Sequence, residues 1–331
     1  MNKIRWGILS TANIAQKRLI PAIQASVDGE VVALASRNAE QAALAASALG
    51  IARSHGSYEA LLADPEIDAI YNPLPNHLHV DWSLKALAAG KHVLCEKPLG
   101  LDCADAERLA RAAKAEPRLK VMEAFMYRFH PQWLLAQKHL RAGDLGQVRH
   151  IHSRFAYNNP DPDNIRNRAD IPGGGGLMDI GCYSISSARW VYGSEPLRVV
   201  GHMSALPGFD VDCITSGLLE FPDGTASFTC STKTEPGQWL DIQAEQGSLQ
   251  MAWPFNPEPG RDNLMWVQRQ GAREEFCHTG IDQYRLMIDA LQRSMLDNTP
   301  VPTPLSDALA NMRVIDALVA SAREGRWITL D

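Results

Sequence analysis

The first third of the chain alternates short apolar runs with amphipathic stretches. Apolar runs at 4–9, 31–35, 67–71, 92–95 and 119–124 have the length and composition of buried strands. Helical patterns lie between them, and the clearest covers 79–89, with Asn76 placed to cap its start and Gly90 to end it. Strands separated by helices require right-handed crossovers, so this part predicts a parallel, doubly wound α/β sheet.

The pattern changes after residue 125. A helix is predicted at 131–141, and longer runs of β-forming residues follow it at 148–157, 197–206, 211–221, 225–234 and 239–244. The segment 222–224, Pro-Asp-Gly, is typical of a tight hairpin turn between two of these runs. An amphipathic helix is predicted at 306–323. Consecutive strands with short connections indicate an α+β second domain with a mostly antiparallel sheet.

Composition narrows the classes of partner. The formal net charge of -6 over 331 residues leaves no basic excess, so neither a nucleic acid nor an anionic membrane surface is expected as a partner. No run is long and apolar enough for a membrane span or a secretory signal, which makes a cytoplasmic location the expectation. The six cysteines form no Cys-x-x-Cys pair and have no close histidine at metal-binding spacing, so reduced thiols and no metal site are expected.

The turn after the first predicted strand is a candidate nucleotide site. Ser10, Ala12 and Ala15 stand where a dinucleotide site carries the glycines of Gly-x-Gly-x-x-Gly. All three are small, so backbone amides at the helix start can approach a pyrophosphate. An ordinary strand-to-helix turn explains this spacing equally well.

The end of the second predicted strand bears on the choice of cofactor. Ser36 and Arg37 stand there, with no acidic residue to accept from the ribose hydroxyls of NAD. A guanidinium pairs bidentately with a 2′-phosphate and the Ser36 hydroxyl can bond it too, so NADP is favoured over NAD. The alternative for Arg37 alone is a surface arginine at a strand end.

Two further segments carry reactive side chains. Glu96, Lys97 and Pro98 follow the apolar strand 92–95, where ligands of open α/β sheets bind, although such a tripeptide ordinarily marks a solvated turn. A glycine-rich run leads into Asp179 and Tyr183. Asp179 can cap a helix, and Tyr183 can be a core aromatic residue with a satisfied hydroxyl.

In this order, the segments resemble the Gfo/Idh/MocA oxidoreductase family (glucose-fructose oxidoreductase and inositol dehydrogenase-like proteins) over essentially the full length. Within it, the closest resemblance is to the branch of dimeric dihydrodiol dehydrogenase and NADP-dependent D-xylose dehydrogenase. The matching segments are WGILSTA (6–12), ASR (35–37), NPLPNHLH (72–79), CEKPL (95–99), EAFMYRFHP (123–131) and GGGLMDIGCY (174–183). The substituted glycines of the nucleotide turn are the main departure from the family pattern.

The resemblance implies two domains with different functions. Residues 1–124 would form an NADP-binding Rossmann domain, and residues 125–331 a substrate-binding and oligomerisation domain with a large open sheet. It further implies a carbohydrate-like substrate and a homodimer or higher homo-oligomer formed through that sheet.

The resemblance also suggests catalytic roles. Tyr183 is expected to transfer the hydroxyl proton, although an unperturbed phenol with a pKa of about 10 is a sluggish base at neutral pH. The ammonium of Lys97 would favour the phenolate and hold the reacting oxygen. Asp179, four residues before Tyr183 and so on the same helical face, would orient Lys97 or a substrate hydroxyl.

The remaining predicted site residues follow from the resemblance. The expected cofactor contacts are Ser10, Thr11, Ala12, Asn13, Ile14, Ser36, Arg37, Asn76, His77, Glu96 and Lys97. Arg128 and His130 are expected at the substrate, although a polar cluster between the domains explains them equally well. Arg166 and Arg168 would grip the phosphate of a nucleotide-linked sugar, but a surface arginine loop is the commoner explanation.

These observations predict an NADP-dependent oxidoreductase that transfers a hydride between nicotinamide and a sugar, a polyol or a sugar-like diol. Oxidation of an aldose at C1 is the first expectation. The alternatives are a ketoreductase acting on a nucleotide-linked keto-sugar, cofactor-assisted glycoside hydrolysis, and a non-catalytic NADP-sensing regulator.

Overall fold

The computed structural model describes residues 3–258 and 260–330. The chain forms two compact units: residues up to Met126 together with Asp282–Leu309, and Tyr127–Ile281 together with the residues from Ala310 onward. The chain therefore leaves the first unit, builds most of the second, and then returns to the first.

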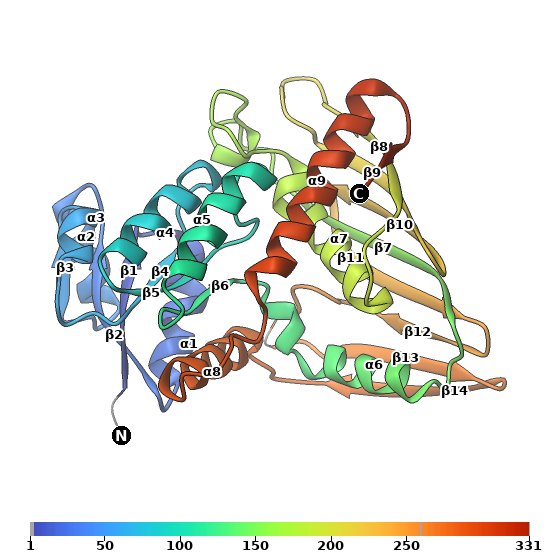
Figure 1. Cartoon of the computed structure of the whole chain (residues 1–331), viewed down its shortest axis with the longest axis horizontal. Helices are drawn as coiled ribbons and strands as arrows, with labels where there is room; N and C mark the ends of the chain where they lie inside the picture. The colour runs from blue at the N-terminus through green and yellow to red at the C-terminus, as the bar shows by residue number, and fades with distance from the viewer. Residues whose placement is uncertain (1–2, 259, 331) are drawn as a thin grey trace. The chain divides into compact units, whose positions relative to one another are not determined.

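The first unit contains a six-stranded parallel sheet in the order β3-β2-β1-β4-β5-β6 (Figure 1). Its strands are β1 (Ile4–Leu9), β2 (Gly29–Ala35), β3 (Arg53–His55), β4 (Ala69–Asn72), β5 (His92–Cys95) and β6 (Val121–Glu123). The predicted parallel, doubly wound sheet is confirmed. The chain order reverses between β1 and β4, which is where ligands of such sheets bind.

Helices separate the strands of this unit, and the helix predicted at 79–89 is observed as α4. The helices are α1 (Ile20–Ala25), α2 (Ala39–Ala48), α3 (Tyr58–Leu62), α4 (His79–Ala88), α5 (Cys103–Ala115) and α8 (Gln283–Leu296). The prediction that Asn76 caps α4 is wrong. A 3-10 turn, η2 (Asn76–Leu78), precedes the helix, and the cap position falls on Leu78 without a side-chain hydrogen bond.

Helix α8 is tied to the sheet by buried polar side chains. The Trp6 indole Nε1 donates to Gln292 Oε1 (3.1 Å), and Gln292 Nε2 donates to Ser26 Oγ (2.7 Å). Gln292 is fully buried, so these bonds satisfy polar groups that would otherwise cost free energy. Residues far along the chain thus complete the first unit.

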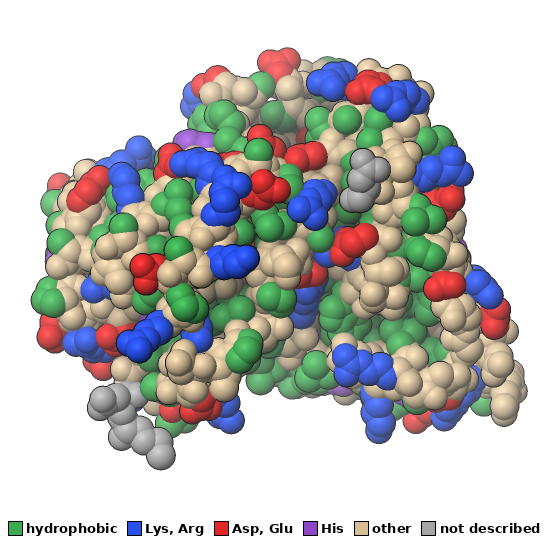
Figure 2. All heavy atoms as spheres, viewed as in Figure 1, with side chains coloured by type: hydrophobic (Ala, Val, Ile, Leu, Met, Phe, Trp, Pro, Cys, Tyr) green, Lys and Arg blue, Asp and Glu red, His purple; other side chains and the backbone are tan. Residues whose placement is uncertain are grey.

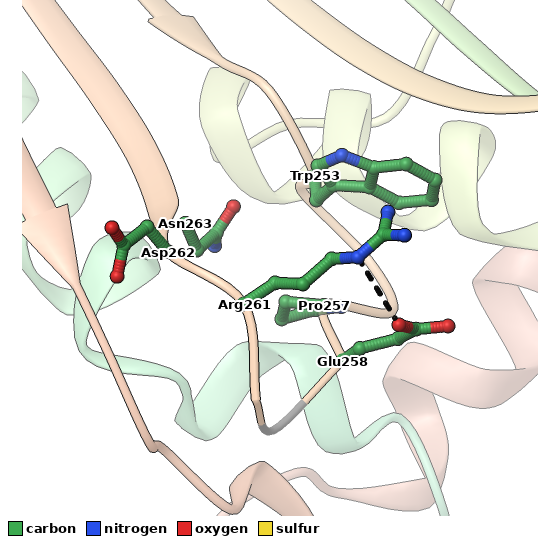
Figure 3. Close-up of a pocket in the computed structure, with 6 residues that line it drawn as sticks. All are labelled: Trp253, Pro257, Glu258, Arg261, Asp262 and Asn263. Atoms are coloured by element: carbon green, nitrogen blue, oxygen red, sulfur yellow. Dashed lines mark ion pairs between the residues drawn. The ribbon is translucent and has the colours of Figure 1, made fainter.

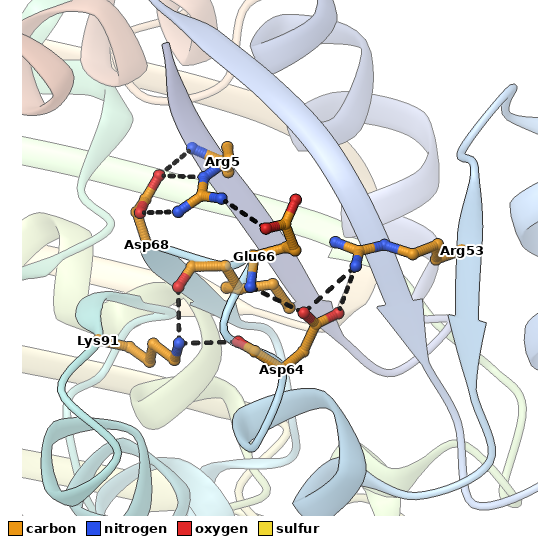
Figure 4. A network of polar contacts seen from close by, with 7 residues as sticks. Arg5, Arg53, Asp64, Glu66, Asp68 and Lys91 are labelled. Carbon is orange, nitrogen blue, oxygen red and sulfur yellow. Dashed lines mark hydrogen bonds and ion pairs between the residues drawn. The ribbon is translucent and has the colours of Figure 1, made fainter. Parts of the chain in front are cut away.

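A polar network occupies the amino ends of the parallel strands (Figure 4). Arg5 donates to both carboxylate oxygens of Asp68, through Nε at 2.9 Å and Nη2 at 2.8 Å. Lys91 is buried, and its ammonium donates to the backbone oxygens of Asp64 (2.8 Å) and Ile67 (2.7 Å). Burial lowers the pKa of Lys91. These groups hold strand ends together, and the candidate chemistry lies at the opposite, carboxyl ends.

The second unit contains a nine-stranded sheet in the order β14-β13-β12-β11-β7-β10-β9-β8-β15 (Figure 1). Neighbouring strands are antiparallel except β7 and β10, so the predicted mostly antiparallel sheet is confirmed. The strands are β7 (Val148–Asn158), β8 (Arg198–Ser204), β9 (Ile214–Phe221), β10 (Gly224–Ser231), β11 (Lys233–Ala244), β12 (Gly247–Met251), β13 (Asn263–Arg269), β14 (Ala272–His278) and β15 (Ile328–Thr329).

Three helices accompany this sheet: α6 (Pro131–Ala142), α7 (Cys182–Tyr192) and α9 (Leu305–Glu324), whose first residues belong to the first unit. Side chains along β7 alternate between buried and exposed positions, with Ile151, Ser153 and Phe155 buried. One sheet face therefore forms a core and the other is more exposed. In the described part of the chain, no helix combines the length and the apolar character needed to cross a bilayer.

Candidate active site

The turn after β1 keeps a glycine-like shape without glycine. Ser10 has a φ of 74°, in the left-handed region that non-glycine residues seldom adopt. Its hydroxyl oxygen accepts from the backbone N–H of Ala12 at 3.2 Å, a local bond that helps to hold this conformation. A π-helical turn, η1 (Ala15–Leu19), then leads into α1. Thr11 lies in the turn, and Asn13 and Ile14 begin the helical segment that follows it.

The end of β2 presents one exposed cation. Ser36 is buried, and its hydroxyl accepts from the backbone N–H of Asn38 at 3.2 Å, whereas Arg37 is exposed. Burial raises the pKa of the neighbouring Tyr58, and the Arg37 guanidinium opposes that rise. Arg37 therefore stands beside an aromatic ring at the carboxyl end of β2.

Glu96 and Lys97 begin a turn after β5 that is held by several hydrogen bonds. The Tyr71 hydroxyl donates to Glu96 Oε1 (2.7 Å), and the backbone N–H of Lys97 donates to Glu96 Oε2 (3.3 Å). The backbone N–H of Glu96 donates to the oxygen of Asn72 at the end of β4 (3.0 Å). The Glu96 carboxylate thus orders the backbone from which the Lys97 side chain extends.

His79 joins the loops that follow β4 and β5, and it was not among the predicted site residues. Its Nε2 lies 2.7 Å from the backbone oxygen of Leu74 and its Nδ1 lies 2.8 Å from that of Pro98. Burial lowers the pKa of His79 to about 4, outweighing the two carbonyl groups. A neutral imidazole carries one N–H, so it donates to one of these oxygens at a time. The sequence feature that could have pointed to His79 is its place as the second histidine of the segment Asn-His-Leu-His at 76–79.

Asn76 and His77 form most of η2, at the carboxyl end of β4. The Nδ1 atom of His77 is buried and has no hydrogen-bond partner within the described residues. A buried polar atom of this kind calls for a ligand or a water molecule. With the turn at Ser10, it fits a nicotinamide nucleotide bound along the carboxyl ends of β1, β2, β4 and β5.

The predicted catalytic residues Asp179 and Tyr183 lie in the second unit. A π-helical turn, η5 (Leu177–Gly181), contains Asp179 and runs into α7, whose first turn contains Tyr183. Such turns are frequent at functional sites. The alternative reading of Asp179 as the helix cap is wrong, because Asp212 Oδ2 accepts from the Leu177 N–H at 2.7 Å.

This cap depends on Gly175. Its φ is +93°, and a Cβ atom there would lie 1.8 Å from Asp212 Oδ1. We expect Gly175→Ala to lower the free energy of unfolding by about 2–4 kcal/mol, because it combines backbone strain with displacement of the cap. Urea denaturation measures the change. Gly176→Ala is the matched control, since a Cβ at Gly176 meets nothing closer than 3.4 Å, and an equal loss in both variants would contradict the role of Asp212.

Asp179 is held by two side chains. Its Oδ1 accepts from Arg166 Nε at 2.9 Å, and its Oδ2 accepts from the Tyr157 hydroxyl. The Asp179 side chain is 12% exposed and that of Arg166 is 47% exposed. Tyr157, at the end of β7, was not among the predicted site residues.

Tyr183 is 5% exposed and lies in an aromatic cluster. Ring centroids of Tyr127, Phe155 and Phe255 lie 5.9, 5.5 and 5.6 Å from that of Tyr183. These rings fix the plane of the phenol and exclude water from its sides.

Arg128 and His130 occupy different environments. Arg128 Nη2 donates to Ser186 Oγ at 2.8 Å, which places the guanidinium beside α7, three residues after Tyr183. His130 is buried and caps α6, its Nδ1 accepting from the Gln132 N–H at 3.2 Å. Burial lowers the pKa of His130 to about 4.

A hollow lies elsewhere in the second unit (Figure 3). It is lined by Trp253, Pro257, Glu258, Arg261, Asp262 and Asn263, with Arg261 Nε 3.3 Å from Glu258 Oε2. No predicted site residue lines it, so it is not part of the candidate active site.

The structure gathers the predicted residues in two sets. The predicted cofactor contacts follow strands of the parallel sheet in the first unit. Arg128, Arg166, Asp179 and Tyr183 lie in the second unit, around the start of α7. Arg168 pairs instead with Asp170, Nε to Oδ1 at 2.9 Å, on the surface. Among the described residues, no group of three or more His, Cys, Asp or Glu side chains is placed to hold a metal ion.

Comparison with known proteins assigns both units. Residues 4–125 match the oxidoreductase family with an NAD-binding Rossmann fold, and residues 133–250 match the GFO/IDH/MocA C-terminal domain. A D-xylose 1-dehydrogenase (NADP(+)) from Haloferax volcanii is 39% identical, covering 98% of this chain and 99% of its own. A trans-1,2-dihydrobenzene-1,2-diol dehydrogenase from Mus musculus is 30% identical over 75% of this chain and 74% of its own.

A similar solved structure is that of KijD10, a 3-ketoreductase from Actinomadura kijaniata, in complex with NADP and TDP-benzene. It superposes with a TM-score of 0.90 at 32% identity, covering 97% of this chain and 98% of its own. Fold and matches together define an NAD(P)-binding oxidoreductase. The chain belongs to the Gfo/Idh/MocA family, as its sequence segments predict.

Proposed function

We propose that this protein is an NADP-dependent oxidoreductase that acts on a sugar, a polyol or a sugar-like diol, with oxidation of an aldose at C1 as the leading reaction. The observation that carries the proposal is the arrangement at the start of α7. There a carboxylate held by two donors, Asp179, precedes the enclosed phenol of Tyr183 by four residues. The sugar-directed names of the H. volcanii and A. kijaniata relatives support it.

The proposed roles follow from the chemistry of each group. A bound nicotinamide accepts or supplies the hydride. Tyr183 takes the proton of the substrate hydroxyl during oxidation and returns it during reduction. The Lys97 ammonium favours the phenolate and the developing charge on the reacting oxygen, and Asp179 accepts a hydrogen bond from a substrate hydroxyl.

A second candidate is reduction of a keto group on a nucleotide-linked sugar. The half-exposed guanidinium of Arg166, bonded to Asp179 through Nε, favours it because such a group suits a phosphate. The structural similarity to KijD10, solved with TDP-benzene, supports it further.

A substrate screen separates these candidates. The unmodified protein is mixed with free aldoses, polyols and diols, each with NADP or NAD, and formation of the reduced cofactor is followed by absorbance. Steady NADPH formation with a free aldose supports the leading proposal and excludes both the regulator and the hydrolase that recycles its cofactor. Consumption of NADPH with nucleotide-linked keto-sugars alone would favour the second candidate.

Cofactor preference tests Arg37 separately. We expect Arg37→Ala to raise the KM for NADP about 10- to 100-fold and to leave the KM for NAD within about twofold, because only NADP carries the paired 2′-phosphate. Steady-state kinetics with both cofactors measure the effect. Arg53→Ala, at the start of β3, is a control, and an equal loss for NAD and NADP in Arg37→Ala would contradict the assignment.

We also propose that the open face of the nine-stranded sheet joins copies of this chain. That face includes Trp239 and Trp266, partly exposed and with ring centroids 5.8 Å apart, of a kind enriched in interfaces. Sedimentation of the protein as a monomer at micromolar concentration would refute this proposal.

A further inference from the structure

The environment of Tyr157 differs from that of Tyr183. Tyr157 ends β7 and donates its hydroxyl hydrogen to Asp179 Oδ2, while Arg166, from the separate turn η4 (Ile165–Asn167), donates to Oδ1. Two donors from different elements therefore fix the plane of one carboxylate. Hydrogen bonds to an ionised group are roughly twice as strong as neutral ones.

Burial raises the pKa of Tyr157 well above its ordinary value, and the charge of Asp179 adds to that rise. The Tyr157 phenol consequently stays protonated throughout the range in which enzymes work. It therefore donates to Asp179, and the proposed proton transfer stays with Tyr183.

We propose that Tyr157 is a positioning residue that sets substrate specificity: it holds Asp179 so that the carboxylate accepts from the hydroxyl next to the reacting carbon. The substrate class is thereby narrowed to compounds with a hydroxyl on the neighbouring carbon, such as aldoses with a free C2 hydroxyl and vicinal diols. This inference rests on the proposed function, because it assigns Asp179 to the substrate.

Arg166 holds the other oxygen of the Asp179 carboxylate. Its backbone oxygen accepts from the N–H of Gly175 at 2.9 Å, which anchors the turn η4 to the glycine-rich run before η5. Loss of the phenol would remove one of the two donors that fix the plane of the Asp179 carboxylate, and the other, Arg166, has a side chain that is 47% exposed.

The test compares an aldose with its 2-deoxy counterpart, using the full chain and NADP. Tyr157→Phe is expected to lower kcat/KM for the aldose about 10- to 100-fold, the range for losing a hydrogen bond to a charged group. For the 2-deoxy sugar, kcat/KM should change less than about twofold. An equal loss for both sugars, or no loss for either, overturns the inference.

Tyr192→Phe is the matched control. It also removes a hydroxyl from a partly buried tyrosine of the second unit, one that donates to the backbone oxygen of Thr225 at 2.9 Å. The ratio of the two kcat/KM values should match that of the unmodified protein. If Tyr192→Phe changes this ratio as much as Tyr157→Phe does, the effect is a general loss of packing and the inference fails.

A second readout does not depend on turnover. The hydroxyl proton of Tyr157, which is partly buried and bonded to a carboxylate, should give a downfield proton resonance that Tyr157→Phe removes and Tyr183→Phe retains. If no such resonance disappears, the hydrogen bond from Tyr157 to Asp179 is refuted even when sugars are oxidised. If the resonance disappears but no sugar is turned over, the hydrogen bond is supported, whereas the proposed function and the substrate assignment are refuted.

Discussion

Replacing Tyr183 with phenylalanine is expected to lower kcat by about 10²- to 10⁴-fold, the range for losing a general acid–base group. The ring remains, so its contacts with Tyr127, Phe155 and Phe255 are kept and the fold should not change. NADP binding should stay within about twofold, because the phenol is assigned to the substrate. Stopped-flow kinetics and a fluorescence titration with NADP measure the two quantities.

Two other outcomes for Tyr183→Phe would contradict the role assigned to Tyr183. Activity within about threefold of the unmodified protein would show that another group transfers the proton, and the mechanism would have to be rebuilt around it. An equally large loss of NADP affinity would instead place the phenol at the cofactor. Tyr192→Phe again serves as the control for a lost tyrosine hydroxyl.

Replacing Lys97 with methionine is expected to lower kcat by about 10²- to 10³-fold, because the variant lacks the cation that stabilises the developing oxyanion. The rate of oxidation should also keep rising with pH over a range in which the unmodified protein is already level, since the phenolate then forms only at higher pH. The pH dependence of kcat measures this second effect, which simple loss of structure would not produce.

Lys97→Arg distinguishes charge from shape. A guanidinium keeps the positive charge but has a planar head and a different reach, so partial recovery relative to Lys97→Met is expected. If all three proteins show the same pH profile, Lys97 does not act on the phenol. Circular dichroism checks that each variant keeps its fold.

The elements that sequence patterns predicted best are those whose burial is uniform along their length. The strands β1 and β5 begin and end at the predicted residues, because parallel strands covered on both faces read as continuous apolar runs. By contrast, β14 was not predicted. Four successive residues, Ala272 to Glu275, are exposed there, so no alternation reveals the strand.

Only those site residues that lie within a recognisable local segment could be predicted from the sequence. Lys97, Asp179 and Tyr183 stand in recognisable motifs, whereas Tyr157 and Asp212 reach the start of α7 from 22 and 35 residues away. Neither residue lies in a segment that marks it. Their roles depend on tertiary pairing, here the strand register that brings the end of β7 to the glycine-rich run, and a single sequence does not contain that information.

The return of residues 282–309 to the first unit makes residues 127–281, most of the second unit, a long insertion within the first. A ribosome must add 286 residues after Trp6, and 266 after Ser26, before Gln292 can contact them. The amino-terminal part of the first unit therefore remains incomplete until residues 127–281 have been synthesised. Cutting the gene after residue 126 would not liberate an autonomous nucleotide-binding module, because the excised fragment would lack the helix that finishes its core.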